Sequence, residues 1–87
     1  MDRDEAIKIY KEIVTQCQLA APYVSLVPHR KNDTLSRGYQ LHIKSTLSAY
    51  DRQVIQRIVD GHKLAWKEEA ETLIIYKPMM EPLNNNK

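Results

Sequence analysis

Apolar residues recur at intervals of three and four over residues 2–19. This stripe consists of Ala6, Ile9, Tyr10, Ile13, Val14 and Cys17. Such spacing places the side chains on one face of an α-helix. Asp2 or Asp4 can cap the first turn, where a carboxylate also suits the positive end of the helix dipole. Pro22 is expected to stop this helix, because the residue before a proline disfavours the α conformation.

Two segments after the first helix have the pattern of β-strands. Residues 23–27 form a short apolar run rich in β-forming side chains. Residues 39–44 alternate, with Tyr39, Leu41 and Ile43 on one side and Gln40, His42 and Lys44 on the other. A period of two indicates a strand with one buried face. We therefore predict a hairpin with a long loop, in which Gly38 supplies a backbone angle needed for the return.

A second helix begins after Ser48, which forms a capping-box pattern with Asp51 three residues later. The apolar face of this helix is predicted to comprise Tyr50, Val54, Ile55, Ile58 and Val59. Gly61 is expected to end the helix in the left-handed conformation.

Strands are predicted over residues 63–67 and 72–77, around a turn at 68–71. The element order is then α-β-β-α-β-β, which is the ferredoxin-like order with its first strand moved to the end. In that fold the first and last strands are antiparallel neighbours, so a tight turn can join them. We therefore predict an α+β two-layer sandwich in a circularly permuted ferredoxin-like arrangement. Two helices would cover one face of a four-stranded antiparallel sheet.

A chain of 87 residues accommodates one domain. We assign this domain to residues 1–77 and a flexible C-terminal tail to residues 78–87, which contain two prolines and a polar end. No apolar run approaches the ~18 residues of a membrane span, and the charged N-terminus differs from a signal peptide. We therefore expect a cytoplasmic protein with no membrane partner.

Residues suited to catalysis or metal binding form no familiar pattern. His29, His42 and His62 lack the spacing of a helical zinc pair. Cys17 belongs to the apolar stripe near the end of the first helix, where a thiol is expected to be inert. The two glycines lie too far apart for a phosphate-binding loop. We expect a non-enzymatic protein without a metal or other cofactor.

The sheet face without helices provides the best functional indication. His42 and Lys44 should lie on it, joined by Lys67 if Trp66 points towards the helices. The last strand is ambiguous, because every residue from 73 to 76 is apolar or aromatic. Either alternation would place apolar or aromatic surface beside the basic side chains.

A basic loop over residues 29–37 lies between the first two strands. Arginine side chains suit phosphate, and aromatic rings can stack on nucleic-acid bases. We therefore favour a small domain that binds RNA or single-stranded DNA through the open face and this loop. The candidate nucleic-acid-binding residues are His29, Arg30, Lys31, Arg37, His42, Lys44, Lys67 and Tyr76.

The same features fit two alternatives. The open face can instead bury itself against a second copy of the chain, which would make the protein a homodimeric interaction module. The basic loop can equally be a solvated connection, since it also contains Asn32, Asp33, Thr34 and Ser36. A net charge of +2 and a pI near 8.7 permit nucleic-acid binding without requiring it.

Overall fold

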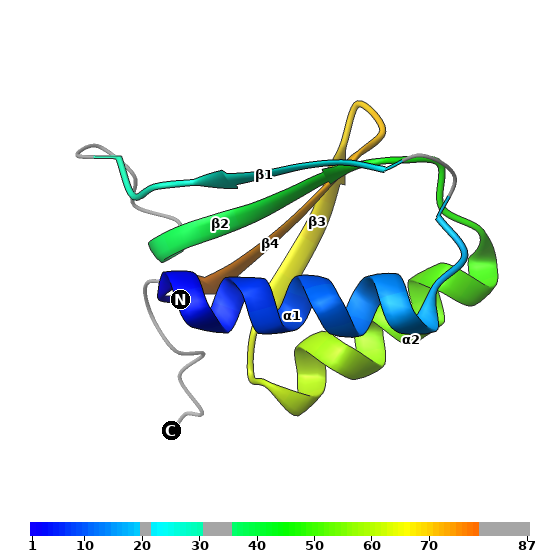
Figure 1. Cartoon of the computed structure of the whole chain (residues 1–87), viewed down its shortest axis with the longest axis horizontal. Helices are drawn as coiled ribbons and strands as arrows, with labels where there is room; N and C mark the ends of the chain where they lie inside the picture. Colours follow the sequence, from blue (N-terminus) through cyan, green and yellow to red (C-terminus); the bar gives the residue numbers. More distant parts are fainter. Residues whose placement is uncertain (20–21, 31–35, 79–87) are drawn as a thin grey trace, which may run out of the picture.

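The computed structural model describes residues 1–19, 22–30 and 36–78. Its elements are α1 (Arg3–Gln16), β1 (Tyr23–Val27), β2 (Ser36–Lys44), α2 (Ala49–Gly61), β3 (Ala65–Glu69) and β4 (Thr72–Pro78). All strand pairs are antiparallel, in the order β1-β2-β4-β3, and both helices cover one face of the sheet (Figure 1). The predicted α+β two-layer sandwich is confirmed.

The last hairpin supports the permuted arrangement. β3 and β4 are antiparallel neighbours, as the first and last strands of the ferredoxin-like order are. Ala70 and Glu71 both have positive φ angles, of 49° and 63°, which suits a two-residue hairpin turn. The turn is shorter than predicted because β3 continues to Glu69. β4 includes Pro78, and the predicted tail from residue 79 onwards lies outside the described residues.

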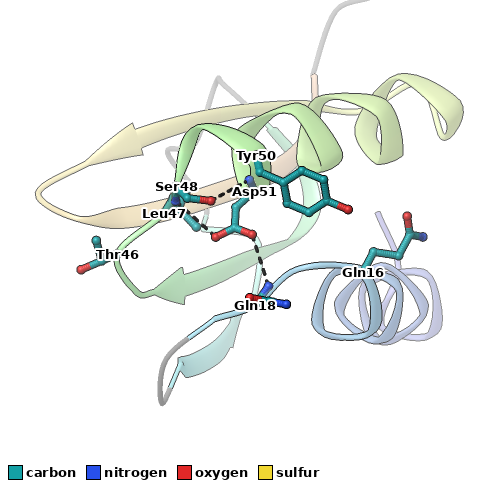
Figure 2. Close-up of a pocket in the computed structure, with 7 residues that line it drawn as sticks. All are labelled: Gln16, Gln18, Thr46, Leu47, Ser48, Tyr50 and Asp51. Carbon is teal, nitrogen blue, oxygen red and sulfur yellow. Dashed lines mark hydrogen bonds between the residues drawn. The ribbon is translucent and has the colours of Figure 1, made fainter.

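The N-terminal ends of both helices are capped by nearby side chains. Asp2 accepts a hydrogen bond from the Glu5 backbone N–H, at 2.7 Å. At α2, Ser48 and Asp51 form the predicted capping box (Figure 2). α1 ends at Gln16, earlier than the prediction based on Pro22.

The end of α2 differs from the prediction. Gly61 is the last helical residue and is not left-handed, whereas Lys63 has a φ of 58°. The Lys63 backbone N–H bonds to the carbonyl of Asp60, and that of Leu64 bonds to the carbonyl of Val59. This is the pattern of a Schellman motif centred two residues later than expected. The later ending lets the buried Leu64 side chain join the core.

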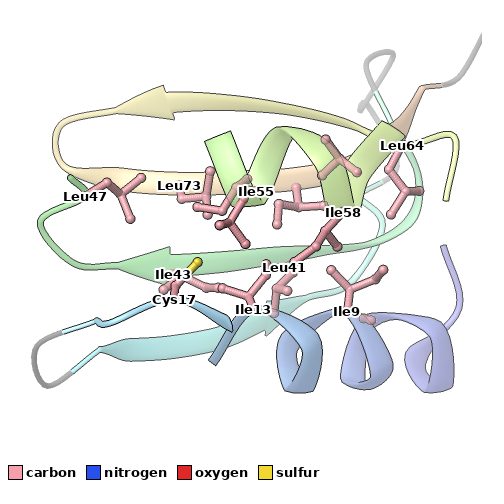
Figure 3. Close-up of a cluster of buried hydrophobic side chains, with 14 of the residues drawn as sticks. Ile9, Ile13, Cys17, Leu41, Ile43, Leu47, Ile55, Ile58, Leu64 and Leu73 are labelled. Carbon is pink, nitrogen blue, oxygen red and sulfur yellow. The ribbon is translucent and has the colours of Figure 1, made fainter. Parts of the chain in front are cut away.

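The core lies between the helices and the sheet (Figure 3). Its fully buried members include Ile9 and Ile13 from α1, Val54, Ile55 and Val59 from α2, and Leu41, Ile43, Leu73 and Ile75 from the sheet. The prediction that Tyr50 belongs to the apolar face of the second helix is wrong, because 61% of its surface is exposed. Within the described part of the chain, neither helix is long and apolar enough to cross a membrane.

β2 starts earlier than predicted and is irregular near its start. Its register against β4 shifts between Arg37 and Leu41. Gly38 has a φ of +65°, which confirms the expected role of this glycine. The Met1 carbonyl accepts a hydrogen bond from the Tyr39 N–H at 2.7 Å, so the N-terminal residue is bound to the irregular stretch.

Candidate functional site

Pairing in the sheet resolves which residues of β4 face outward. Residues that lie directly opposite one another on paired strands point to the same face. Leu41 and Ile43 are buried under the helices and lie opposite Ile75 and Leu73. The alternate residues of β4, Ile74 and Tyr76, therefore lie on the open face.

His42 lies near the middle of this open face. It is opposite Ser25 of β1 on one side and Ile74 of β4 on the other, and Ile74 is in turn opposite Lys67 of β3. One row of side chains thus crosses all four strands. The next row along the strands contains Lys44, which is exposed.

A hollow of about 360 Å³ opens on this face, and we name it the sheet hollow. Its lining residues are Val27, Pro28, Arg30, Gln40, His42, Lys67, Glu69 and Ile74. Ile74 is only 6% exposed although no helix covers it, and it lines the hollow between His42 of β2 and Lys67 of β3. The lining thus combines three apolar residues, Val27, Pro28 and Ile74, with five polar or charged ones.

The sides of the sheet hollow carry more positive than negative charge. Arg30 and Lys67 contribute two cations, and Glu69 is the one carboxylate among the lining residues. The Lys67 ammonium lies 3.2 Å from a Glu69 carboxylate oxygen, and both side chains are partly exposed. Exposed pairs of this kind contribute about 0–1 kcal/mol, so Lys67 can leave Glu69 for another anion at little cost.

Hydrogen bonds hold the His42 ring within the hollow. Its Nε2 lies 2.8 Å from the Gln40 Oε1, and the Gln40 Nε2 donates to the Ser36 Oγ, also at 2.8 Å. Burial, followed by the positive charge of Arg30, lowers the pKa of His42 from its ordinary value, and Lys67 acts in the same direction. Glu69 opposes the shift. Together, these effects favour the neutral form of the His42 ring in the free protein.

The structure brings three of the predicted site residues together in the sheet hollow: Arg30, His42 and Lys67. His29 is exposed beside the lining residue Pro28. Tyr76 is partly buried and lies on the same face as the hollow, opposite Ala65.

Two predicted residues do not join this group. Arg37 lies opposite Lys77, which shares its side of β4 with the buried Leu73 and Ile75. Arg37 thus points to the helix-covered side of the sheet, away from the hollow. Lys31 lies outside the described residues.

The sequence prediction missed Glu69 as part of the site. Because Glu69 lies two positions after Lys67, period-two alternation would have placed both on the open face if the strand had been extended. The prediction ended this strand at Lys67 and assigned Glu69 to the turn. β3 continues to Glu69, which is why a carboxylate faces the hollow.

A second pocket, which the sequence prediction also missed, is larger but less charged. It measures about 630 Å³ and is lined by Gln16, Gln18, Thr46, Leu47, Ser48, Tyr50 and Asp51, between the end of α1 and the start of α2 (Figure 2). Asp51 is 2% exposed, and its carboxylate accepts hydrogen bonds from the backbone N–H groups of Gln18 and Ser48. These bonds explain why a carboxylate is buried here, and they give Asp51 a structural role. We therefore place the candidate site in the sheet hollow.

The described residues contain no group of three or more His, Cys, Asp or Glu side chains placed to hold a metal ion. Cys17 is buried, and burial together with the neighbouring Asp51 raises the pKa of its thiol to about 11. A thiol in this state is a poor nucleophile at neutral pH. No protein-family model, curated protein or solved structure matches the chain.

Proposed function

We propose that this protein binds single-stranded nucleic acid, RNA or DNA, across the helix-free face of its sheet. The observation that carries the proposal is the sheet hollow, where Arg30 and Lys67 from distant parts of the chain flank His42. A backbone phosphate needs such cations, and its binding is driven largely by their charge. The proposal involves no catalytic step and no cofactor.

Tyrosines on the same face support a single-stranded ligand. Tyr76 lies on the face that contains the hollow, and Tyr23 at the edge of the sheet is 73% exposed. Bases that stack on such rings contribute about 1–3 kcal/mol each, and stacking requires bases that are free of a duplex. Lys44 lies in the same row as Tyr23 and can hold a neighbouring phosphate.

Charge on the two faces offers a matched comparison. Lys11 and Arg57 are exposed cations on α1 and α2, the helices that cover the other face of the sheet (Figure 1). The double variant Lys11→Ala with Arg57→Ala therefore lowers the net charge as much as Arg30→Ala with Lys67→Ala. Only the second pair removes cations from the hollow.

The test is a nitrogen–proton NMR titration with short single-stranded RNA and DNA at two salt concentrations. We expect shifts at residues of the hollow and at Tyr76, with affinity falling as salt rises. The Arg30/Lys67 variant should bind more weakly. The slope of its log affinity against log salt concentration should be smaller by about 1 for each phosphate that the variant no longer neutralises. The Lys11/Arg57 variant should keep the slope of the original protein.

Two outcomes would contradict the proposal. Equal weakening of binding in both double variants would show that the ligand responds to net charge and not to the hollow. Absence of shifts, together with a mass near twice 10.2 kDa, would favour the homodimer, whose own copy would then cover the open face.

A further inference from the structure

This inference rests on the proposed function and concerns how the same hollow is regulated. It starts from the hydrogen bonds of His42. The Gln40 amide nitrogen donates to the Ser36 hydroxyl, which leaves the Gln40 Oε1 facing the His42 Nε2 at 2.8 Å. An amide oxygen can only accept, so the His42 Nε2 carries the proton in the neutral ring. The second ring nitrogen, Nδ1, is then unprotonated and makes no hydrogen bond to the described residues.

The groups around His42 come from several parts of the chain. Arg30 follows β1, Lys67 and Glu69 belong to β3, and the side chains opposite His42 in β1 and β4 are the uncharged Ser25 and Ile74. Positive charge therefore predominates near the ring. Burial and Arg30 keep the pKa of His42 below its ordinary value in the free protein.

An entering anion would reverse this balance. A phosphate held by Arg30 and Lys67 neutralises the two cations that disfavour a charged imidazole. When Lys67 turns from Glu69 towards the phosphate, the Glu69 carboxylate keeps its negative charge near the ring. Both changes favour the imidazolium form.

We propose that the sheet hollow binds one phosphodiester group between Arg30 and Lys67 and that His42 takes up one proton at Nδ1 as it binds. The proton comes from solvent, and no other bond forms or breaks. In the complex, the imidazolium retains its Nε2–H donation to Gln40 and gains an Nδ1–H donor for the phosphate.

The proposal fixes the direction of the pH dependence. Affinity should increase as the pH falls from the His42 pKa of the complex to that of the free protein. The steepest possible change is about tenfold in Kd per pH unit, which is one proton per binding event. Phosphodiesters carry a constant charge in this range, so the dependence reports on the protein.

The experiment measures binding of a short oligothymidylate between about pH 5 and 8, the window in which histidine titrates. Calorimetry in two buffers with different ionisation enthalpies counts the protons taken up, and NMR of the imidazole nitrogens identifies the residue and the nitrogen. The protein is compared with three variants: His42→Gln, His29→Gln as the competing histidine near the hollow, and His62→Gln as the control outside the site. We expect uptake approaching one proton, which His42→Gln abolishes and the His62→Gln control retains.

The outcomes separate this inference from the proposed function. Binding that is independent of pH, without proton uptake, overturns the inference and leaves nucleic-acid binding intact. Loss of the pH dependence in His29→Gln, with His42→Gln unaffected, also overturns it. Absence of oligothymidylate, RNA and DNA binding at every pH overturns both.

Discussion

The Asp51 carboxylate accepts a hydrogen bond from the backbone N–H of Gln18, at 3.2 Å, although 33 residues separate them. Its other oxygen accepts the Ser48 N–H, so one buried side chain both caps α2 and holds the segment that follows α1. Asp51, which the sequence pattern predicts only as part of a helix cap, thus also connects the two helices.

Replacement of Asp51 by alanine should reduce the free energy of unfolding by about 1–3 kcal/mol, because it leaves the backbone N–H groups of Ser48 and Gln18 without their acceptors. Asp51→Asn keeps one acceptor oxygen and should cost less. Asp60→Ala, at the exposed end of α2, is the control and should change stability by about 0.5 kcal/mol or less. Urea unfolding measures all three. Equal stabilities for the Asp51→Ala and Asp60→Ala variants would contradict the role assigned to Asp51.

Replacing each of the two glycines with alanine should change the stability of the protein in opposite directions. A Cβ at Gly38 would lie 2.5 Å from the Met1 carbonyl oxygen, and the φ of +65° is unfavourable for alanine. Gly38→Ala should therefore destabilise the protein by more than about 1 kcal/mol. A Cβ at Gly61 meets nothing within 4 Å, so Gly61→Ala should stabilise the helix by about 0.5–1 kcal/mol. Thermal unfolding of the two variants checks the signs, and a stabilised Gly38→Ala would refute this close approach to Met1.

Cys17 should couple stability to alkaline pH. Its thiol pKa is about 11 in the folded protein, against an ordinary value of 9.0. The folded state therefore favours the neutral thiol, and this contribution is complete below the unfolded pKa and is lost as pH rises through the folded one. We expect stability to fall between about pH 9 and 11, and less steeply in Cys17→Ala. Urea unfolding across this pH range measures the free energy of unfolding of both proteins. An identical dependence of that free energy on pH in the two would contradict the prediction.

The adjacent residues Ile74 and Ile75 should differ when truncated. Ile75 is fully buried between sheet and helices, so Ile75→Ala should cost about 2–5 kcal/mol through reduced burial and a closed cavity. Ile74 borders the sheet hollow, which is open to solvent, so Ile74→Ala removes apolar packing without creating a closed cavity. Its cost should be smaller. Chemical unfolding compares them, and a larger destabilisation for Ile74→Ala would mean that the faces of β4 are assigned the wrong way round.

Arg37 shows why the candidate site was only partly predictable. In the sequence it belongs to the same basic loop as Arg30, and nothing local separates the two. β2 begins before Arg37, and its pairing with Lys77 directs Arg37 to the helix-covered side. The extra residues between Arg37 and Leu41 set the register of β2 against β4. Because a register depends on both paired strands, the residues around Arg37 alone do not reveal which way this side chain points.

Features that depend on residues close together in the chain can be predicted from the sequence alone. The helical stripe that contains Ile9 and Ile13, the capping box of Ser48 and the alternation around His42 all follow from spacings of a few positions. The open face of β4, and the hollow that Arg30 and Lys67 share, depend instead on how distant parts of the chain pack together. Residues 73–76 of β4 are all apolar or aromatic, so this stretch carries no local difference between its two faces. Its orientation is set by where the most apolar surface can be buried, which depends on strands and helices far along the chain.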